Sequence, residues 1–273
     1  AVCSLGIVKG QTVSDSLAIV SAQWKIESPQ KGIIHKYVSI PQLYQVPQSI
    51  SLIEIDPVAG LKVGVAVSDK MKETSKIASE YNAIAAINGS YFDMKRGNSV
   101  CFLKADRQII DTTMQSEFKL RVTGAINVRK GKIKLIPWSK QIEKEYEGET
   151  GMVLASGPLM LKDGQICDWN SCGANFIRTK HPRSAVATTK EGKILLITVD
   201  GRFPEQAEGV NIPELAHLIR ILGGEDALNL DGGGSTTLWL SGASDNGVVN
   251  YPCDNGRFDH AGERKVPNIL YIH

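Results

Sequence analysis

From Gly32 onward, short apolar runs rich in β-branched residues alternate with clusters of Gly, Asn, Asp and Arg. Short runs of this kind, bounded by turn residues, are typical of β-strands. The segments with this pattern are GIIHKYVSI, SISLIEID, LKVGVAV, NAIAAIN, RVTGAINV, KILLITVD and ALNLD. Most of the chain is therefore expected to form strands.

The segment NIPELAHLIRILGG has a helical pattern instead, because its apolar residues from Leu215 to Leu222 recur at intervals of three and four. Asn211 is placed to cap the first turn, and Glu214 completes a capping box with it. Gly223 supplies a left-handed stop after the last turn. We therefore predict a helix between Asn211 and Gly223.

Shorter helices are predicted over residues 73–81 and in SKQIEKEYEG. Runs of strands separated by a few helices predict an α+β fold, with curved, mainly antiparallel sheets and helices packed on them. Residues 1–31 show no clean periodicity and are expected to form an N-terminal arm. Residues 32–273 contain no convincing linker and are expected to form one domain.

The composition limits the kinds of partner that the protein can have. Of its 273 residues, 42% are hydrophobic and 22% are charged, as in ordinary folded soluble proteins. No apolar run approaches the roughly 18 to 20 residues that cross a bilayer, so no membrane span is expected. With 31 Lys and Arg against 29 Asp and Glu, the chain lacks the net positive charge that favours nucleic acid as a partner. An anionic ligand must therefore be bound by a local cluster.

The chain contains five cysteines but no C-x-x-C pair of the kind that binds zinc. They are expected to be mainly buried free thiols. Cys167 and Cys172 flank the turn-rich stretch DWNS and are close enough in sequence to form a disulfide in an oxidising compartment. The sequence begins AVCSLG without an initiator Met, which suits a chain whose signal peptide has been removed, so a secreted or periplasmic location is expected.

Four segments end an apolar strand or border one with a cluster of residues that strand packing alone does not require. They are NGSYFD (residues 88–93), HPRSA (181–185), VDGR (199–202) and NLDGGGSTT (229–237). Loops at strand ends are where functional residues collect. These segments are therefore the candidates for a site.

NLDGGGSTT is the most specific of the four segments. Gly232–Gly234 free the backbone for positive φ angles, which lets successive N–H groups converge on an anion. Asp231, Ser235 and Thr236 flank that concavity. The alternative is a tight turn held by an Asx-type bond from Asp231.

Two further segments combine carboxylate and guanidinium groups. Asp200 follows the apolar run ILLITV, and Arg202 follows two residues later on the same face. Arg183 begins an alternating strand with small neighbours, which leaves room for a ligand. A guanidinium group fits phosphate oxygens in pairs. The alternatives are an Asp-Gly turn with a surface arginine, and a lone surface arginine at 183.

NGSYFD offers groups that suit sugar hydroxyls, since the amide of Asn88 and the phenol of Tyr91 can each donate and accept. Tyr91 and Phe92 fit a hydrophobic core equally well. His181 is interpreted as a structural or rim residue, and the other histidines have no cluster partners that would indicate a metal site.

Taken together and in order, these segments resemble the phosphodiester glycosidase family. The resemblance covers the chain from about Gly32 to its end and includes NGSYFD, SGPLMLKDG, HPRSAVATTKEGKILLITVDGR, ELAHLIRILGG, ALNLDGGGSTTLWL and ERKVPNIL. One departure is Ser90, which stands where the family often has a second glycine after Asn-Gly. The resemblance implies that residues 32–273 are a catalytic domain.

A mammalian member of this family removes N-acetylglucosamine from a sugar-phosphate diester and leaves a phosphomonoester. The resemblance therefore implies a hydrolase that cleaves the anomeric C–O bond of a sugar-1-phosphodiester or related glycan. Catalysis is expected from Asp231 and Asp200, with their division of roles open. Substrate binding is expected from Asn88, Arg183, Arg202, Gly232, Gly233, Gly234, Ser235 and Thr236.

No cofactor is expected to be required, because no His, Asp and Glu residues have the spacing of a catalytic metal site. The Asp-rich turn leaves room for a structural divalent cation. Two other functions use similar residues. One is a carbohydrate- or glycan-phosphate-binding module without catalysis, and the other is a phosphodiesterase that cleaves the P–O bond. The latter normally needs metal ions held by His and Asp clusters.

Overall fold

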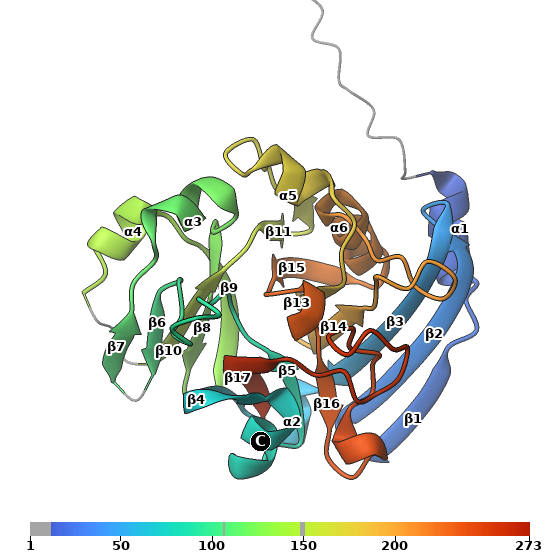
Figure 1. The fold of residues 1–273 in the computed structure, drawn as a ribbon, viewed down its shortest axis with the longest axis horizontal. Helices are drawn as coiled ribbons and strands as arrows, with labels where there is room; N and C mark the ends of the chain where they lie inside the picture. Colours follow the sequence, from blue (N-terminus) through green and yellow to red (C-terminus); the bar gives the residue numbers. More distant parts are fainter. Residues whose placement is uncertain (1–11, 106, 148–150) are drawn as a thin grey trace, which may run out of the picture.

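The computed structural model describes residues 12–105, 107–147 and 151–273 of the chain. Three sheets form its framework, and all the strand pairings described are antiparallel (Figure 1). Helices pack on these sheets. The predicted α+β class is confirmed.

The largest sheet extends from the right-hand side of Figure 1 to its centre. Its strand order is β1 (Lys25–Gln30), β2 (Ile33–Leu43), β3 (Val46–Ile55), β14 (Ile194–Val199), β13 (Arg183–Thr189), β15 (Gly224–Asn229), β11 (Leu159–Lys162) and β12 (Gln165–Ile166). A second sheet has the order β16 (Leu238–Leu240), β5 (Ala85–Asn88), β17 (Lys265–Ile272) and β4 (Val63–Glu73). The third, at the left of Figure 1, has the order β7 (Gln108–Asp111), β6 (Leu103–Ala105), β10 (Met152–Ser156), β8 (Gly124–Arg129) and β9 (Lys132–Pro137).

Strand β14 is buried along its whole length because both faces of the large sheet are covered. Leu195 and Ile197 pack in the cluster that includes the apolar face of helix α6 (Ile212–Ile221). Ile194 and Leu196 pack in a second cluster, shared with the other two sheets. Successive side chains of a strand point to opposite faces, so ILLITV has to be apolar almost throughout.

Helix α6 has the termini that the sequence predicts. Asn211 Oδ1 accepts a hydrogen bond from the Glu214 amide at 2.9 Å, and the Glu214 carboxylate accepts one from the Asn211 amide at 3.0 Å. Gly223 follows the last turn with a φ of +91°. The capping box and the left-handed stop are therefore confirmed.

The other helices are short. The two shorter predictions correspond to α2 (Thr74–Glu80) and α4 (Lys140–Lys144). The sequence analysis did not identify α1 (Val13–Val20), α3 (Gln115–Leu120) and α5 (Ala174–Arg178). Helices α3 and α5 have six and five residues, which is too short for a helical period to stand out.

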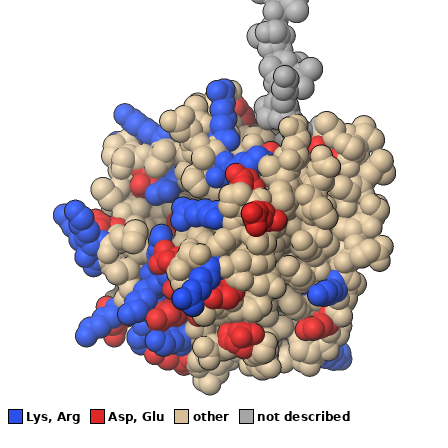
Figure 2. Space-filling model, turned by 45° about the vertical axis from the view of Figure 1, so that its right-hand side comes forward, with Lys and Arg blue, Asp and Glu red and all other residues tan. Residues whose placement is uncertain are grey.

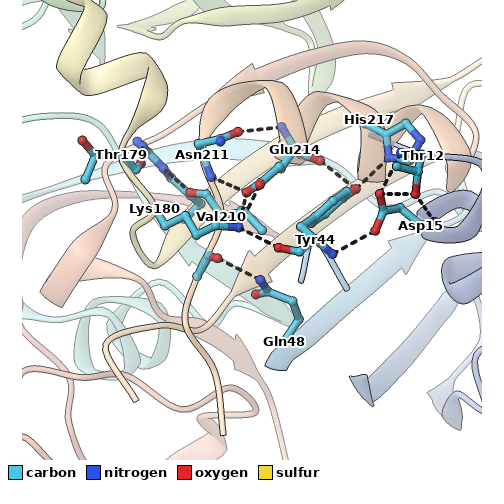
Figure 3. A network of polar contacts seen from close by, with 12 residues as sticks. Thr12, Asp15, Tyr44, Gln48, Thr179, Lys180, Val210, Asn211, Glu214 and His217 are labelled. Atoms are coloured by element: carbon cyan, nitrogen blue, oxygen red, sulfur yellow. Dashed lines mark hydrogen bonds and ion pairs between the residues drawn. The ribbon is translucent and has the colours of Figure 1, made fainter. Parts of the chain in front are cut away.

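The part of the predicted arm that the structure describes is tied to the large sheet and to α6 (Figure 3). Asp15 in α1 accepts a hydrogen bond from the Tyr44 amide at 3.0 Å, and Tyr44 Oη lies 2.7 Å from His217 Nδ1. Ser16 Oγ lies 3.0 Å from the other ring nitrogen of His217. Residues 12–31 thus contain a docked helix and the edge strand β1, and the domain boundary at residue 31 stays a prediction.

The described cysteines are Cys101, Cys167, Cys172 and Cys253, and all four are free thiols. The pairing considered for Cys167 and Cys172 is thus not formed in this structure, and Cys3 lies outside the described residues. Within residues 12–105, 107–147 and 151–273, no helix is both long and apolar enough to cross a membrane.

Candidate active site

The turns of three predicted segments lie side by side. Asn88, at the end of β5, donates through Nδ2 to the Asp231 carbonyl oxygen at 2.7 Å. The Asp231 amide donates to the Gly89 carbonyl oxygen at 3.0 Å, and the Gly233 amide donates to the Pro182 carbonyl oxygen at 2.9 Å. The turns after β5, before β13 and after β15 therefore form one cluster.

The fourth segment, after β14, joins this cluster through Asn250, a residue that the sequence analysis did not identify. Asn250 Nδ2 donates to Asp200 Oδ1 at 2.9 Å and to the Thr236 carbonyl oxygen at 3.1 Å. Arg202 lies against Gly233, since its Nη2 would be only 2.9 Å from a Cβ atom placed there. All four segments thus meet in one region, where their residues have different environments.

Asp231 is partly exposed as a residue, although its carboxylate lies in a buried environment. Its Oδ1 accepts a hydrogen bond from the Gly232 amide at 3.0 Å. Burial raises the pKa of Asp231, whereas the Ser235 hydroxyl and the positive charges of Arg121 and Arg264 oppose that rise. A carboxylate in these surroundings can act on a substrate as a base, a nucleophile or a source of negative charge.

Asp200 has a different environment because its side chain is fully buried. It accepts hydrogen bonds from Ser49 Oγ at 2.7 Å, Asn250 Nδ2 at 2.9 Å and the Tyr251 amide at 3.0 Å. Burial raises its pKa to about 6, although these three donors favour the ionised form. Asp200 holds the loop that contains Asn250 and Tyr251 beside the turn at Gly232–Gly234, called the glycine turn below.

The glycine turn makes space for side chains that approach it closely. A Cβ atom on Gly232 would lie 2.5 Å from the Pro182 carbonyl oxygen, and one on Gly234 would collide with the Arg264 guanidinium group. Gly233 has a φ of +62°, which glycine adopts without strain. The amides of Gly232 and Gly233 already donate to Asp231 and Pro182. In this conformation these two amides are not free to bind an anion.

Arg183 is almost fully buried, with 2% of its surface exposed. Its Nη2 donates to the carbonyl oxygens of Phe176 at 3.0 Å and Thr179 at 2.9 Å, and its Nε donates to that of Val210 at 3.2 Å. Burial lowers its pKa to about 10. Arg183 therefore joins helix α5 to the segment before α6.

The chain segments that hold Arg183 are themselves fixed by a polar network (Figure 3). Lys180 Nζ lies 2.8 Å from both carboxylate oxygens of Glu214, and it donates to the Tyr44 carbonyl oxygen at 3.4 Å. Gln48 donates to the Gly209 carbonyl oxygen at 2.9 Å. The network links the segments at Thr179 and Val210, which hold Arg183, to α6 and, through Tyr44, to α1.

Asn88 is also fully buried, and its amide binds other parts of the site. Its Oδ1 accepts hydrogen bonds from Ser184 Oγ at 2.6 Å and from the Thr237 amide at 3.1 Å. Ser235 and Thr236 are buried as well, and Thr236 Oγ1 has no hydrogen-bond partner among the described residues. These contacts fix the main chain of the glycine turn.

Two arginines near Asp231 were not identified from the sequence. The Arg121 guanidinium group lies 3.6 Å from the centre of the Tyr91 ring, and its Nε donates to Glu117 Oε2 at 2.7 Å. Arg264 lies against Gly234 and donates from Nη2 to Asp254 Oδ1 at 2.5 Å. Both residues directly precede the apolar part of a strand segment, RVTGAINV and ERKVPNIL, without a neighbouring glycine cluster that could have marked them.

The surface carries no large patch of one charge on the face shown in Figure 2, where basic and acidic side chains intermingle and the upper right is largely uncharged. Burial and the charges of Arg183 and Arg202 lower the pKa of His181, which favours its neutral form. Among the residues that the structure describes, no group of three or more His, Cys, Asp or Glu side chains could hold a metal ion. That the protein requires no cofactor, and that it has room for a structural divalent cation, both stay predictions.

Residues 81–273, which include all four segments, match the family model of the phosphodiester glycosidases. The chain belongs to this family, and the resemblance stated from its motifs is confirmed. N-acetylglucosamine-1-phosphodiester alpha-N-acetylglucosaminidase of mouse is 24% identical over 205 residues, covering 69% of this chain and 37% of the relative. The human protein of the same name is 24% identical over 222 residues, covering 74% and 39%. The matched region thus spans less than two fifths of these relatives.

Solved structures show the same fold. The catalytic domain of the zebrafish protein of that name, auto-inhibited by its pro-peptide, has a TM-score of 0.67 at 20% identity, covering 92% of this chain and 87% of that one. An uncharacterised protein of Synechocystis has a TM-score of 0.65 at 14% identity, with 92% and 63% covered. A protein of Burkholderia pseudomallei described as exported has a TM-score of 0.61 at 14% identity, with 86% and 75% covered.

Proposed function

We propose that this protein hydrolyses a sugar-1-phosphodiester at the anomeric C–O bond and releases the free sugar and a phosphomonoester. The observation that carries the proposal is the Asp231 carboxylate beside the glycine turn, whose pKa the positive charges of Arg121 and Arg264 lower against the effect of burial. Arg202 lies against the same glycine turn. The site thus combines one carboxylate with several guanidinium groups.

This combination suits the chemistry of the reaction. The leaving phosphomonoester is a stable anion, so its departure needs positive charge more than a carboxylic acid that protonates it. The sugar develops positive charge at C1 in the transition state, which a nearby carboxylate stabilises. Arginines bind phosphate oxygens in pairs and in a fixed orientation.

We assign the phosphate to Arg121, Arg202 and Arg264, and the reaction at C1 to Asp231. Asp231 is preferred over Asp200 because Asp200 is fully buried and its carboxylate accepts three hydrogen bonds within the chain. Asp200 is assigned a positioning role.

Arg183 and Asn88 are positioning residues as well, since each binds other parts of the chain. The contacts of Arg183 hold α5, and the contacts of Asn88 hold the glycine turn. Both of these elements carry or adjoin the groups that are assigned to the substrate. The names of the mouse and human relatives, which specify an N-acetylglucosamine phosphodiester, support a glycan-phosphate substrate. The description of the Burkholderia protein as exported supports a location outside the cytoplasm.

Hydrolysis in oxygen-18 water tests the proposal. A panel of sugar-1-phosphodiesters is incubated with the protein, and both products are analysed by mass spectrometry. The label is expected in the released sugar, because water attacks C1. Label in the phosphomonoester would assign the chain to the phosphodiesterases that cleave P–O bonds. Binding of the whole panel without turnover would assign it to the carbohydrate-binding modules.

A further inference from the structure

A pocket of about 330 Å³ lies directly beside the glycine turn. The ion pair of Arg264 with Asp254, which lies against Gly234, also lines this pocket. The volume is at the lower end of the roughly 300–1,000 Å³ that ligand sites occupy. Arg264 and Asp254 therefore contact both the candidate active site and a separate pocket.

The three carboxylates in the lining of this pocket, Glu73, Asp254 and Glu263, already have partners in the protein. Glu263 accepts hydrogen bonds from the Ser75 amide at 3.0 Å and from Ser75 Oγ at 2.6 Å. Glu73 forms an ion pair with Lys76 at 3.0 Å. Hydroxyl groups of a ligand would have to compete with these contacts, which makes the pocket a poor site for a second sugar.

The apolar part of the lining consists of Met71, Phe92 and Met94. Met94 is 61% exposed, although the turn that bears it is well held. Asp93 Oδ1 accepts hydrogen bonds from the amides of Lys95 at 2.8 Å and Arg96 at 3.1 Å. Thioether side chains adapt to apolar ligands of different shapes. An exposed methionine on a fixed turn beside a phenylalanine ring is suited to cover an apolar group.

We propose that this pocket is the leaving-group subsite and that it takes an apolar alkyl or aryl group esterified to the phosphate. The inference rests on the proposed function. If Arg264 binds the phosphate, the second ester substituent can extend from the phosphate into the pocket that Arg264 lines. Water then forms the new bond to C1 and gives up a proton to the Asp231 carboxylate. The bond from C1 to the phosphate oxygen breaks, and the electron pair stays on the phosphomonoester, which keeps its apolar group.

Three diesters of one sugar 1-phosphate test this subsite, with octyl, phenyl and glyceryl groups as the second substituent. We expect kcat/KM for the octyl and phenyl esters to exceed that for the glyceryl ester by at least about tenfold, the scale on which a few buried methylene groups discriminate between substrates. Equal values, or a preference for the glyceryl ester, would overturn the inference while leaving the proposed function in place.

Substitutions then test whether this pocket causes the preference for the octyl ester over the glyceryl ester. Met94→Ser is expected to lower the ratio of octyl to glyceryl kcat/KM by several-fold. Met114→Ser is the matched control, because Met114 is 53% exposed and does not line the pocket, so its ratio should equal that of the wild type. An unchanged ratio in Met94→Ser would remove the pocket from the explanation.

Binding of octyl phosphate and glyceryl phosphate, measured by calorimetry, separates this inference from the proposed function. These monoesters are products of the proposed reaction, so their binding requires no turnover. Tighter binding of octyl phosphate that weakens in Met94→Ser supports the subsite, even if no diester is hydrolysed. Absence of hydrolysis in all three diesters would count against the proposed function, and equal binding of the two monoesters would count against the subsite.

Discussion

Replacing Asp200 by Asn removes a carboxylate that is destabilised by its burial. Asp200 Oδ1 accepts hydrogen bonds from Asn250 and from the Tyr251 amide, and Oδ2 accepts one from Ser49. An asparagine can keep the first two contacts through its own oxygen. The Ser49 hydroxyl can rotate and accept from the new amide. The substitution therefore removes the charge with little change of shape.

The magnitude follows from the pKa of Asp200, which burial raises from 3.8 to about 6. A shift of about two units corresponds to about 3 kcal/mol between the two protonation states. The folded chain binds this proton more tightly than the unfolded chain. The Asp200 contribution to stability is therefore most favourable below pH 4 and is lost as the pH rises through 6. About 2 kcal/mol of the change falls between pH 4.5 and 7.5.

Urea unfolding of the wild type and of Asp200→Asn at pH 4.5, 6.0 and 7.5 measures this effect. Other groups titrate equally in both proteins, so the difference between their free energies of unfolding isolates Asp200. The difference is expected to shift by about 2 kcal/mol in favour of the variant as the pH rises to 7.5. A difference that is constant over this range would show that the pKa of Asp200 is not raised, and would return Asp200 to the list of groups open to substrate.

Three further predictions concern activity. Asp231→Asn should lower kcat by about 10²- to 10⁴-fold with little change in KM, and a loss confined to KM would contradict the role assigned to Asp231. Gly234→Ala should displace Arg264 and lower kcat/KM by about tenfold or more. Arg257→Ala is the control, because Arg257 is exposed in the loop that carries Asp254, and it should leave kcat/KM unchanged. Dialysis against a chelator should leave hydrolysis largely intact, and complete loss that one divalent ion restores would show a catalytic metal.

The fold class and helix α6 could be predicted because their signals are local. Apolar runs between turn residues mark strands, and Asn211 and Glu214 mark the start of the helix by their spacing alone. The order of strands in the sheets could not be predicted. Strands β5 and β17 pair although they lie at residues 85–88 and 265–272, and no local pattern states which strands become neighbours.

The candidate site was predictable where a backbone requirement marks the sequence. Three glycines in a row drew attention to Asp231, and the structure puts the turns of the other predicted segments beside it. The distinction between Asp231 and Asp200 could not be made, because it depends on burial by Asn250 and Ser49 from distant segments. Arg121 and Arg264 carry no local signal, since an arginine before a strand is usually an ordinary surface residue.

Strand β17 lies between β4 and β5, so the last strand of the sequence occupies an interior position in its sheet. Asn268 Oδ1 in this strand accepts a hydrogen bond from the Ser90 amide at 2.8 Å. Arg264 directly precedes the strand. The turn after β5 and one wall of the glycine turn are therefore completed only when these residues insert. A chain cut before residue 264 would leave the facing edges of β4 and β5 unpaired, and unpaired strand edges are prone to aggregate. The strand that completes the turn after β5 therefore also keeps these two edges from pairing with other chains.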